Sequence, residues 1–267
     1  MAIRAFLCSF VIATGFAASA SGADFLAKLD RVQASVDSGR IVEAYRLNGE
    51  LQVALTIELK NPRVMPDMRN IPTVANGIIA VRAALAENNV LAAYEREMVL
   101  SMALHQAKAA LTPADRLQQL EQDLTQDRSR EGRLGEIGYA ALEVGDLVKA
   151  ESYGRELLAA SANPKPMPHG DSIYHSNQIL GIVAIRRNDV NEAKLRLAAS
   201  GATPGSPSLN SFGPTFLLAK ELCAKGEKDS VLQFLEACGK FWKMDRGKLA
   251  EWSAIIRGGG VPRFESY

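Results

Sequence analysis

The side chains best suited to chemistry lie close together, because His169, Asp171 and His175 fall within seven residues. Two imidazoles and a carboxylate could bind zinc. However, His169 lies in a proline-rich loop and His175 about one turn into a predicted helix, so they lack the four-residue spacing that directs two ligands at one ion. We therefore expect no metal site here. Asp171 or Ser172 should instead cap the helix, and His175 should pack between helical hairpins.

Other catalytic arrangements have no counterpart in the sequence. It contains no Gly-x-Ser-x-Gly nucleophile elbow, no phosphate-binding Walker loop and no His-Glu-x-x-His pair. His105 is predicted on a long helix with Ser101 one turn earlier, and no third group is identifiable to complete a triad. We expect neither a catalytic residue nor a cofactor.

Residues 1–23 have the pattern of a secretory signal peptide. Arg4 gives a positive start, an apolar run too short to span a bilayer follows, and small residues come next. Cleavage is expected after Ala20 or after Ala23, the latter leaving Asp24 as the new N-terminus. The mature chain is therefore predicted to be exported, to a bacterial periplasm or to the outside of the cell.

The mature chain carries almost no net charge, because removal of Arg4 leaves equal numbers of basic and acidic residues. The one-sided basic patch that nucleic-acid binding requires is not evident. After the signal peptide, no stretch is long and apolar enough for a membrane helix. We therefore expect no nucleic-acid partner and no membrane span in the mature chain.

Two cysteines remain after cleavage, Cys223 and Cys238. They are predicted on the two antiparallel helices of one hairpin, whose turn lies near Glu227. Their unequal distances from this turn offset them by about 10 Å along the helix axis, whereas a disulfide needs Cα atoms within about 7 Å. We expect two buried, reduced thiols.

These side chains must be positioned by helices, and the second half of the chain contains two matching helix–turn–helix segments. The first reads Ile137-Gly138-x-x-Ala141-x-x-x-Gly145-Asp146-x-x-x-Ala150, and it recurs 43 residues later as Leu180-Gly181-x-x-Ala184-x-x-x-Asn188-Asp189-x-x-x-Ala193. A third, looser copy begins at Ala219, 38 residues after Gly181. A recurring offset of this kind is typical of stacked helical hairpins.

The small residues of the repeat have mechanical roles. Gly138 and its counterpart Gly181 should let the two helices of one hairpin approach closely. Gly145, like Asn188 in the second copy, should take a left-handed backbone conformation at the end of a helix. Asp146, like its counterpart, should cap the helix that follows.

Helix is predicted almost throughout the mature chain, because apolar residues recur at three- and four-residue spacing and no alternating strand pattern is clear. Residues 24–111 should form N-terminal helical hairpins. Residues 112–257 should form the clearer repeats with a C-terminal cap, and residues 258–267 a flexible tail. The loop 201–214 has two interpretations: a rigid binding edge that presents Asn210, Ser211 and Phe212, or a structural plug for the core.

The repeat spacing over residues 130–240 resembles the tetratricopeptide repeat family, although the period is longer and the large aromatic residue that begins each repeat in that family is missing. The resemblance implies an all-α array of antiparallel helical hairpins, a tetratricopeptide-like α-solenoid. A second resemblance, to a group of uncharacterised exported bacterial proteins, rests on His175-x-x-x-Ile179-Leu180-Gly181, Leu209-Asn-Ser-Phe-Gly-Pro and Phe241-Trp-Lys.

These observations predict a non-catalytic scaffold that binds a protein or peptide partner in the bacterial envelope. The partner would lie in an inner groove lined by the first helix of each hairpin. Asn177, Gln178, Arg186 and Lys220 are the expected contact residues, because they are polar and lie on predicted first helices. Two alternatives stay open: a hydrolase that acts on cell-wall material, and a structural subunit of a larger envelope assembly.

Overall fold

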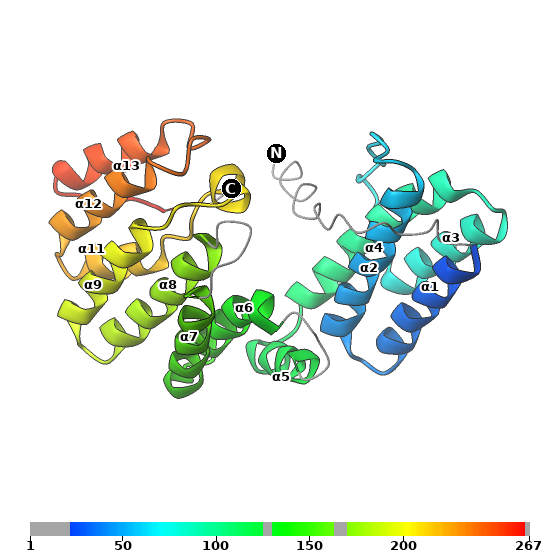
Figure 1. Ribbon diagram of the computed structural model, residues 1–267, viewed down its shortest axis with the longest axis horizontal. Coiled ribbons are helices and arrows are strands. Elements are labelled where there is room, and N and C mark those ends of the chain that lie inside the picture. The colour runs from blue at the N-terminus through cyan, green and yellow to red at the C-terminus, as the bar shows by residue number, and fades with distance from the viewer. Residues whose placement is uncertain (1–21, 125–129, 163–169, 265–267) are drawn as a thin grey trace. The chain divides into compact units, whose positions relative to one another are not determined.

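The computed structural model describes residues 22–124, 130–162 and 170–264, and every regular element in these ranges is an α-helix (Figure 1). The predicted all-α class is therefore confirmed for these residues. The helices pack into two units, α1–α5 and α6–α13. Their bounds are α1 Gly22–Asp37, α2 Ile41–Glu58, α3 Val74–Ala86, α4 Val90–Ala109, α5 Pro113–Leu124, α6 Arg130–Glu143, α7 Leu147–Ser161, α8 Gly170–Arg186, α9 Val190–Gly201, α10 Pro207–Phe212, α11 Leu217–Ala224, α12 Lys228–Cys238 and α13 Lys248–Arg257.

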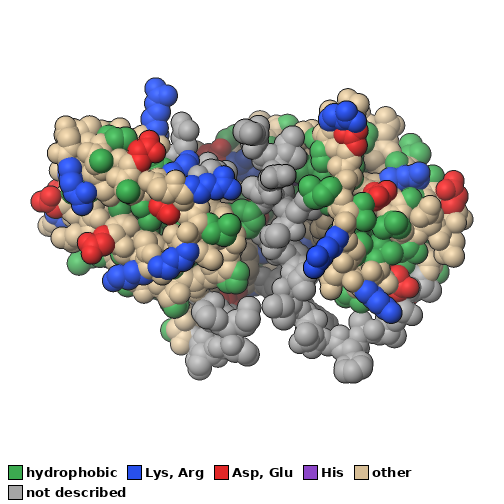
Figure 2. Space-filling model, turned by 90° about the horizontal axis from the view of Figure 1, so that it is seen from above, with side chains coloured by type: hydrophobic (Ala, Val, Ile, Leu, Met, Phe, Trp, Pro, Cys, Tyr) green, Lys and Arg blue, Asp and Glu red, His purple; other side chains and the backbone are tan. Residues whose placement is uncertain are grey.

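Within the described ranges, no helix is both long enough and apolar enough to cross a bilayer. On the face drawn in Figure 2, basic and acidic side chains are interspersed, with apolar side chains between them. Almost all of the predicted signal peptide, residues 1–21, lies outside the described part of the chain.

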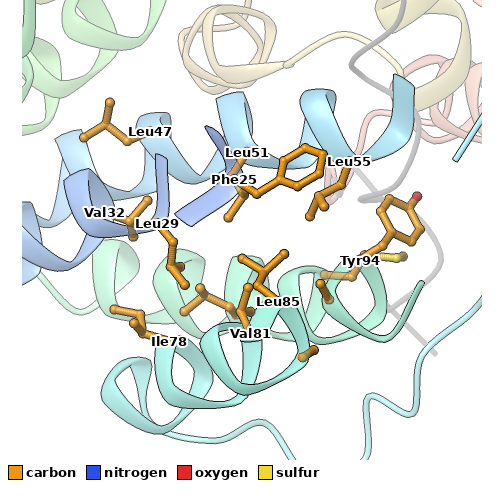
Figure 3. Packing of buried hydrophobic residues seen from close by; sticks show 14 of the residues in the cluster. Phe25, Leu29, Val32, Leu47, Leu51, Leu55, Ile78, Val81, Leu85 and Tyr94 are labelled. Atoms are coloured by element: carbon orange, nitrogen blue, oxygen red, sulfur yellow. The ribbon is translucent and has the colours of Figure 1, made fainter. Parts of the chain in front are cut away.

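A ring of four helices forms the core of the N-terminal unit. Helix α1 packs on α2 and α3, and α4 packs on the same two helices from the other side. Side chains from all four helices, such as Phe25, Leu51 and Val81, point toward one another in a single apolar cluster (Figure 3). The two hairpins α1–α2 and α3–α4 therefore bury their apolar faces against each other.

Equivalent residues of these two hairpins lie 49 positions apart. On each of α2 and α4, four residues spaced three or four positions apart form a completely buried stripe. The stripes are Ala44, Asn48, Leu51 and Leu55 on α2, and Ala93, Glu97, Leu100 and Leu104 on α4. Each second helix thus presents the same pattern to the core, with one polar residue at the same position.

Helix α5 belongs to the N-terminal unit, although the sequence suggests that it begins the later repeats at residue 112. It packs on α2, where Leu117, Leu120 and Leu124 are buried. Arg46 of α2 lies 2.9 Å from Asp123 of α5 and adds an ion pair to this contact. The contacts therefore group α5 with the helices before it.

The C-terminal unit contains three hairpins, α6–α7, α8–α9 and α11–α12. Each first helix packs on the first helix of the next hairpin, since α6 contacts α8 and α8 contacts α11. The second helices α7 and α9 also pack on the first helix that follows them. Helix α8 is therefore surrounded on several sides, and α13 packs on α12 at the end of the unit.

The same turn joins the two helices of all five hairpins. One residue takes a left-handed backbone conformation, at Gly39, Asn88, Gly145, Asn188 and Gly226. The next backbone N–H donates to a carbonyl five residues earlier, over 2.9–3.0 Å, which is the Schellman pattern. Asp146 accepts a hydrogen bond from the N–H of Lys149, and Asp189 does the same from Glu192. The predicted left-handed residues and aspartate caps are confirmed.

The repeat glycines accommodate a different neighbour from the one predicted. A Cβ atom at Gly138 would lie 2.6 Å from Cδ1 of Ile179, which belongs to the next hairpin. At Gly181, a Cβ atom would lie 2.2 Å from Leu218 of the following hairpin and 3.1 Å from Arg196 of its own hairpin. The prediction of closeness within one hairpin is wrong for Gly138, because the tight contact forms where successive first helices stack.

Aromatic side chains close the C-terminal end of this unit. Phe264 stacks on Phe216 with a centroid separation of 5.5 Å, and its ring also meets that of Trp252 edge-on. Phe264 of the predicted tail thus packs on this aromatic cluster, whereas residues 265–267 lie outside the described chain. Cys223 and Cys238 are both buried and free, as predicted.

Candidate functional site

His175, the central residue of the motif that could bind zinc, lies on α8 against the neighbouring helix α6. Its Nδ1 atom is 3.1 Å from the hydroxyl of Tyr139. Its ring also meets the rings of Tyr139 and Tyr174 edge-on, with centroids 5.7 and 5.5 Å away. The predicted position of His175 between hairpins is confirmed.

Burial sets the charge state of this pair. It lowers the pKa of His175, and the nearby carboxylate of Asp171 only partly opposes this effect. Burial also raises the pKa of Tyr139 above its ordinary value. At neutral pH the imidazole and the phenol are therefore both uncharged, and the pair can share one hydrogen bond between α6 and α8.

Asp171 and Ser172 connect α8 to other elements instead of capping it. The helix begins at Gly170, so both residues already lie in its first turn. Asp171 accepts a hydrogen bond from the hydroxyl of Ser206 at 2.8 Å, and Ser172 donates one to Glu131 at 3.1 Å. The predicted cap is wrong because the helix already includes Gly170 and so begins before either residue could cap it.

The zinc interpretation gains no support from the described residues. His169 lies outside them. In the ranges that can be described, no group of three or more His, Cys, Asp or Glu side chains gathers in a way that could hold a metal ion. Asp171 and His175 point their polar atoms at Ser206 and Tyr139, respectively.

The loop 201–214 contains the short helix α10 and makes structural contacts. Thr203 donates a hydrogen bond to the carbonyl of Gly170, and Asn210 accepts one from the backbone N–H of Lys243. Gly205 approaches Gly170 so closely that a Cβ atom added to Gly170 would clash with the backbone oxygen of Gly205. Of the two interpretations of this loop, the contacts of Asn210 favour the structural one.

Two of the four expected partner contacts are buried. Gln178 is completely buried and donates a hydrogen bond to Ser200 of α9. Asn177 is 3% exposed, donates to the carbonyl of Ile173, and lies 3.3 Å from a guanidinium nitrogen of Arg196. In this structure neither side chain is therefore accessible to a partner, because neighbouring helices surround α8.

Arg186 remains on the surface but already connects three helices. One guanidinium nitrogen donates to the carbonyl of Leu142 at the end of α6, over 2.6 Å. Another lies 3.5 Å from a carboxylate oxygen of Glu221 on α11. This side chain therefore holds the stacked first helices together, and any contact with a partner would use the rest of its exposed guanidinium.

Lys220, the fourth expected contact residue, lies at the surface of a first helix. It is exposed on α11, and Leu217 on the same helix is 49% exposed. Together with Arg186 and Glu221, these residues form what we call the α11 surface: Arg186, Leu217, Lys220 and Glu221. It combines two cations, one carboxylate and one exposed apolar side chain.

Two polar arrangements in the N-terminal unit are absent from the sequence prediction. Asn48 and Glu97 meet in the core, and Gln119 of α5 bonds to the first turn of α2. The 49-residue offset could have revealed the first, because it places Asn48 and Glu97 at the same position of two otherwise apolar stripes. No comparable signal marks Gln119.

Comparison with known protein families, curated proteins and solved structures finds no match to this chain.

Proposed function

We propose that the mature chain is an exported, non-catalytic helical scaffold that binds a protein or peptide partner in the bacterial envelope. The observation that carries the proposal is the stacking of successive first helices in the C-terminal unit, α6 on α8 and α8 on α11. Repeated hairpins stacked in this way commonly present extended surfaces to partners. A tetratricopeptide-like solenoid is the arrangement that we propose for this unit.

The partner would bind at the α11 surface rather than over α8. Leu217 offers an apolar contact, and Lys220 and Arg186 offer positive charge. A partner segment with an apolar side chain next to a carboxylate would complement this arrangement. This location replaces the groove over Asn177 and Gln178.

Export rests on the sequence pattern of residues 1–23. Cleavage after Ala23 would leave Asp24 in the first turn of α1, with Phe25 as the first buried core residue. The mature chain that begins at Asp24 would therefore keep the core of the four-helix ring.

An affinity pull-down tests the proposal. The mature chain from Asp24 would serve as bait in envelope extract from its own organism, with mass spectrometry as the readout. We expect one partner to be recovered repeatedly and to be lost with the double variant L217S/K220E. K240E, which changes an exposed lysine outside the α11 surface in the same way, should retain the partner.

Two outcomes would contradict this proposal. Equal recovery by both variants would exclude the α11 surface as the binding site. Failure of a folded bait to recover any specific protein would favour the alternative of a hydrolase acting on cell-wall material. Activity on purified wall material that disappears when one carboxylate is replaced would then establish that alternative.

A further inference from the structure

Asn48 of α2 and Glu97 of α4 form a polar pair inside the apolar core of the four-helix ring. Both side chains are completely buried. The amide nitrogen of Asn48 donates a hydrogen bond to Oε1 of Glu97 over 2.6 Å, so the pair joins two helices of different hairpins. Figure 3 shows apolar side chains of this core, including Leu47, Leu51 and Tyr94.

One oxygen atom of each side chain, left without a partner by this bond, determines what the pair requires. Oδ1 of Asn48 and Oε2 of Glu97 are buried and have no hydrogen-bond partner among the residues that the structure describes. Both atoms are acceptors when Glu97 is ionised, so neither can satisfy the other. A proton on Oε2 supplies a donor for the amide oxygen of Asn48, and it also removes a buried charge that is costly without a partner.

Within the described part of the chain, no charged neighbour offsets that charge. Burial raises the pKa of Glu97 well above its ordinary value, and the hydrogen bond from Asn48 is the one opposing influence. The titratable and charged groups on the helices that pack here are directed to other partners or contribute no electrostatic effect at Glu97. They are Glu43, Tyr45, Arg46, Glu50 and Glu58 on α2, Arg82 on α3, and Tyr94, Glu95, Arg96, His105 and Lys108 on α4.

Several of these groups have identified partners. Arg46 binds Asp123 and Glu50, Arg82 binds Asp30, and Arg96 donates to a backbone carbonyl. Tyr45 lies beside His105 and Lys108. The carboxyl of Glu97 therefore depends on its own proton and on Asn48.

We propose that Glu97 is a neutral carboxylic acid that closes a two-hydrogen-bond pair with Asn48, and that this pair makes the four-helix ring more stable in acid than at neutral pH. One hydrogen bond runs from the Asn48 amide to Oε1, and the other from the protonated Oε2 to Asn48 Oδ1. The pair thus joins α2 to α4, and its contribution to stability changes with the pH of the compartment. The inference does not depend on the partner-binding proposal.

The direction of the effect follows from proton uptake. In the unfolded chain Glu97 ionises near its ordinary pKa of 4.5, whereas in the folded chain it keeps its proton to much higher pH. Its contribution to stability is therefore fully present below pH 4.5 and is lost as the pH rises toward the folded-state pKa. Within this window the unfolding constant should rise by up to about tenfold per pH unit.

The test compares the mature chain with its E97Q variant by urea unfolding between pH 5 and pH 8. Glutamine keeps both hydrogen bonds and cannot titrate, so the ratio of wild-type to E97Q unfolding constants should rise with pH. E95Q, a partly exposed position on the same helix, serves as the matched control and should follow the wild type. Parallel curves for wild type and E97Q across this pH range would overturn the proposal.

Two further readouts make the result specific to this pair. Circular dichroism follows the helices of both units, whereas both tryptophans, Trp242 and Trp252, belong to the C-terminal unit. Tryptophan fluorescence therefore reports on the C-terminal unit by itself. In the wild type alone, the NMR shift of the Glu97 carboxyl carbon should remain that of a protonated acid at pH 6, and titration near pH 4.5 would refute the idea.

Discussion

Gln119 of α5 supplies the helix cap that α2 lacks in its own sequence. Its side-chain oxygen accepts a hydrogen bond from the N–H of Val42 over 3.1 Å, and its amide nitrogen donates to the carbonyl of Gly39 over the same distance. In three of the other hairpin turns, a side-chain oxygen caps the next helix, from Asn89, Asp146 and Asp189. In the last hairpin, Glu227 occupies this position and makes no such hydrogen bond. At this position the first hairpin has Arg40, which cannot accept a hydrogen bond.

Removing this borrowed cap should destabilise the N-terminal unit. We expect Q119A to lower the free energy of unfolding by about 1 kcal/mol, the usual cost of losing a helix cap. Q118A, at an exposed position of the same helix, carries the same change in helix propensity without the cap. Urea unfolding followed by circular dichroism measures both, and equal stabilities for the two variants would show that the Gln119 bonds contribute nothing.

Stacking of the first helices should make Gly138 sensitive to a single added methyl group. G138A places a Cβ atom 2.6 Å from Cδ1 of Ile179, whereas a methyl group at Gly132, on the same helix, meets nothing within 4 Å. We expect G138A to be about 1–3 kcal/mol less stable than G132A because of overpacking. Since I179V removes Cδ1, it should recover part of this loss in the G138A background. Additive effects of G138A and I179V on the melting temperature would argue against the contact.

Substitutions of Gln178 and Lys220 should have different effects on stability, although the sequence predicts that both contact a partner. Q178A removes a buried hydrogen-bonded side chain and should cost about 1–3 kcal/mol of stability. K220A changes an exposed side chain and should stay within about 0.5 kcal/mol of the wild type. Thermal unfolding measures the stability of both variants. A Q178A variant as stable as the wild type would indicate that α8 has an accessible face.

The C-terminal unit should lose stability in acid through His175. Burial lowers the pKa of His175 below its ordinary value of 6.5, so the unfolded chain takes up this proton before the folded chain does. The contribution is fully present above pH 6.5 and is lost as the pH falls toward the folded-state pKa. H175Q should remove this part of the pH dependence, measured by the fluorescence of Trp242 and Trp252 during urea unfolding. A pH dependence that persists unchanged in H175Q would rule out His175 as its source.

The C-terminal segment should contribute to stability through Phe264. F264A removes a ring that stacks on Phe216 and meets Trp252, and we expect a loss of about 1–3 kcal/mol with a change in tryptophan emission. V261A, at a side chain that is 50% exposed in the same segment, should have little effect. If F264A is as stable as V261A, the segment does not hold the cap together.

Features governed by neighbouring residues could be predicted from the sequence alone. A left-handed residue such as Gly145 and a cap such as Asp146 act within about five positions of the chain, so their types and spacing define the turn. The positions of Cys223 and Cys238 on one hairpin follow from the same turns. For this reason the left-handed residues and the aspartate caps of the repeated turns agree with the prediction.

Features governed by contacts between distant segments were decided only by the tertiary structure. Whether Gln178 faces solvent depends on how many helices surround α8, and Gly138 meets Ile179 because two hairpins stack there. Gln119 caps a helix that begins 78 positions earlier, at Ile41. Local sequence therefore determined which helices and turns form, whereas the burial of polar residues depended on packing between surfaces whose pairing no short-range pattern specifies.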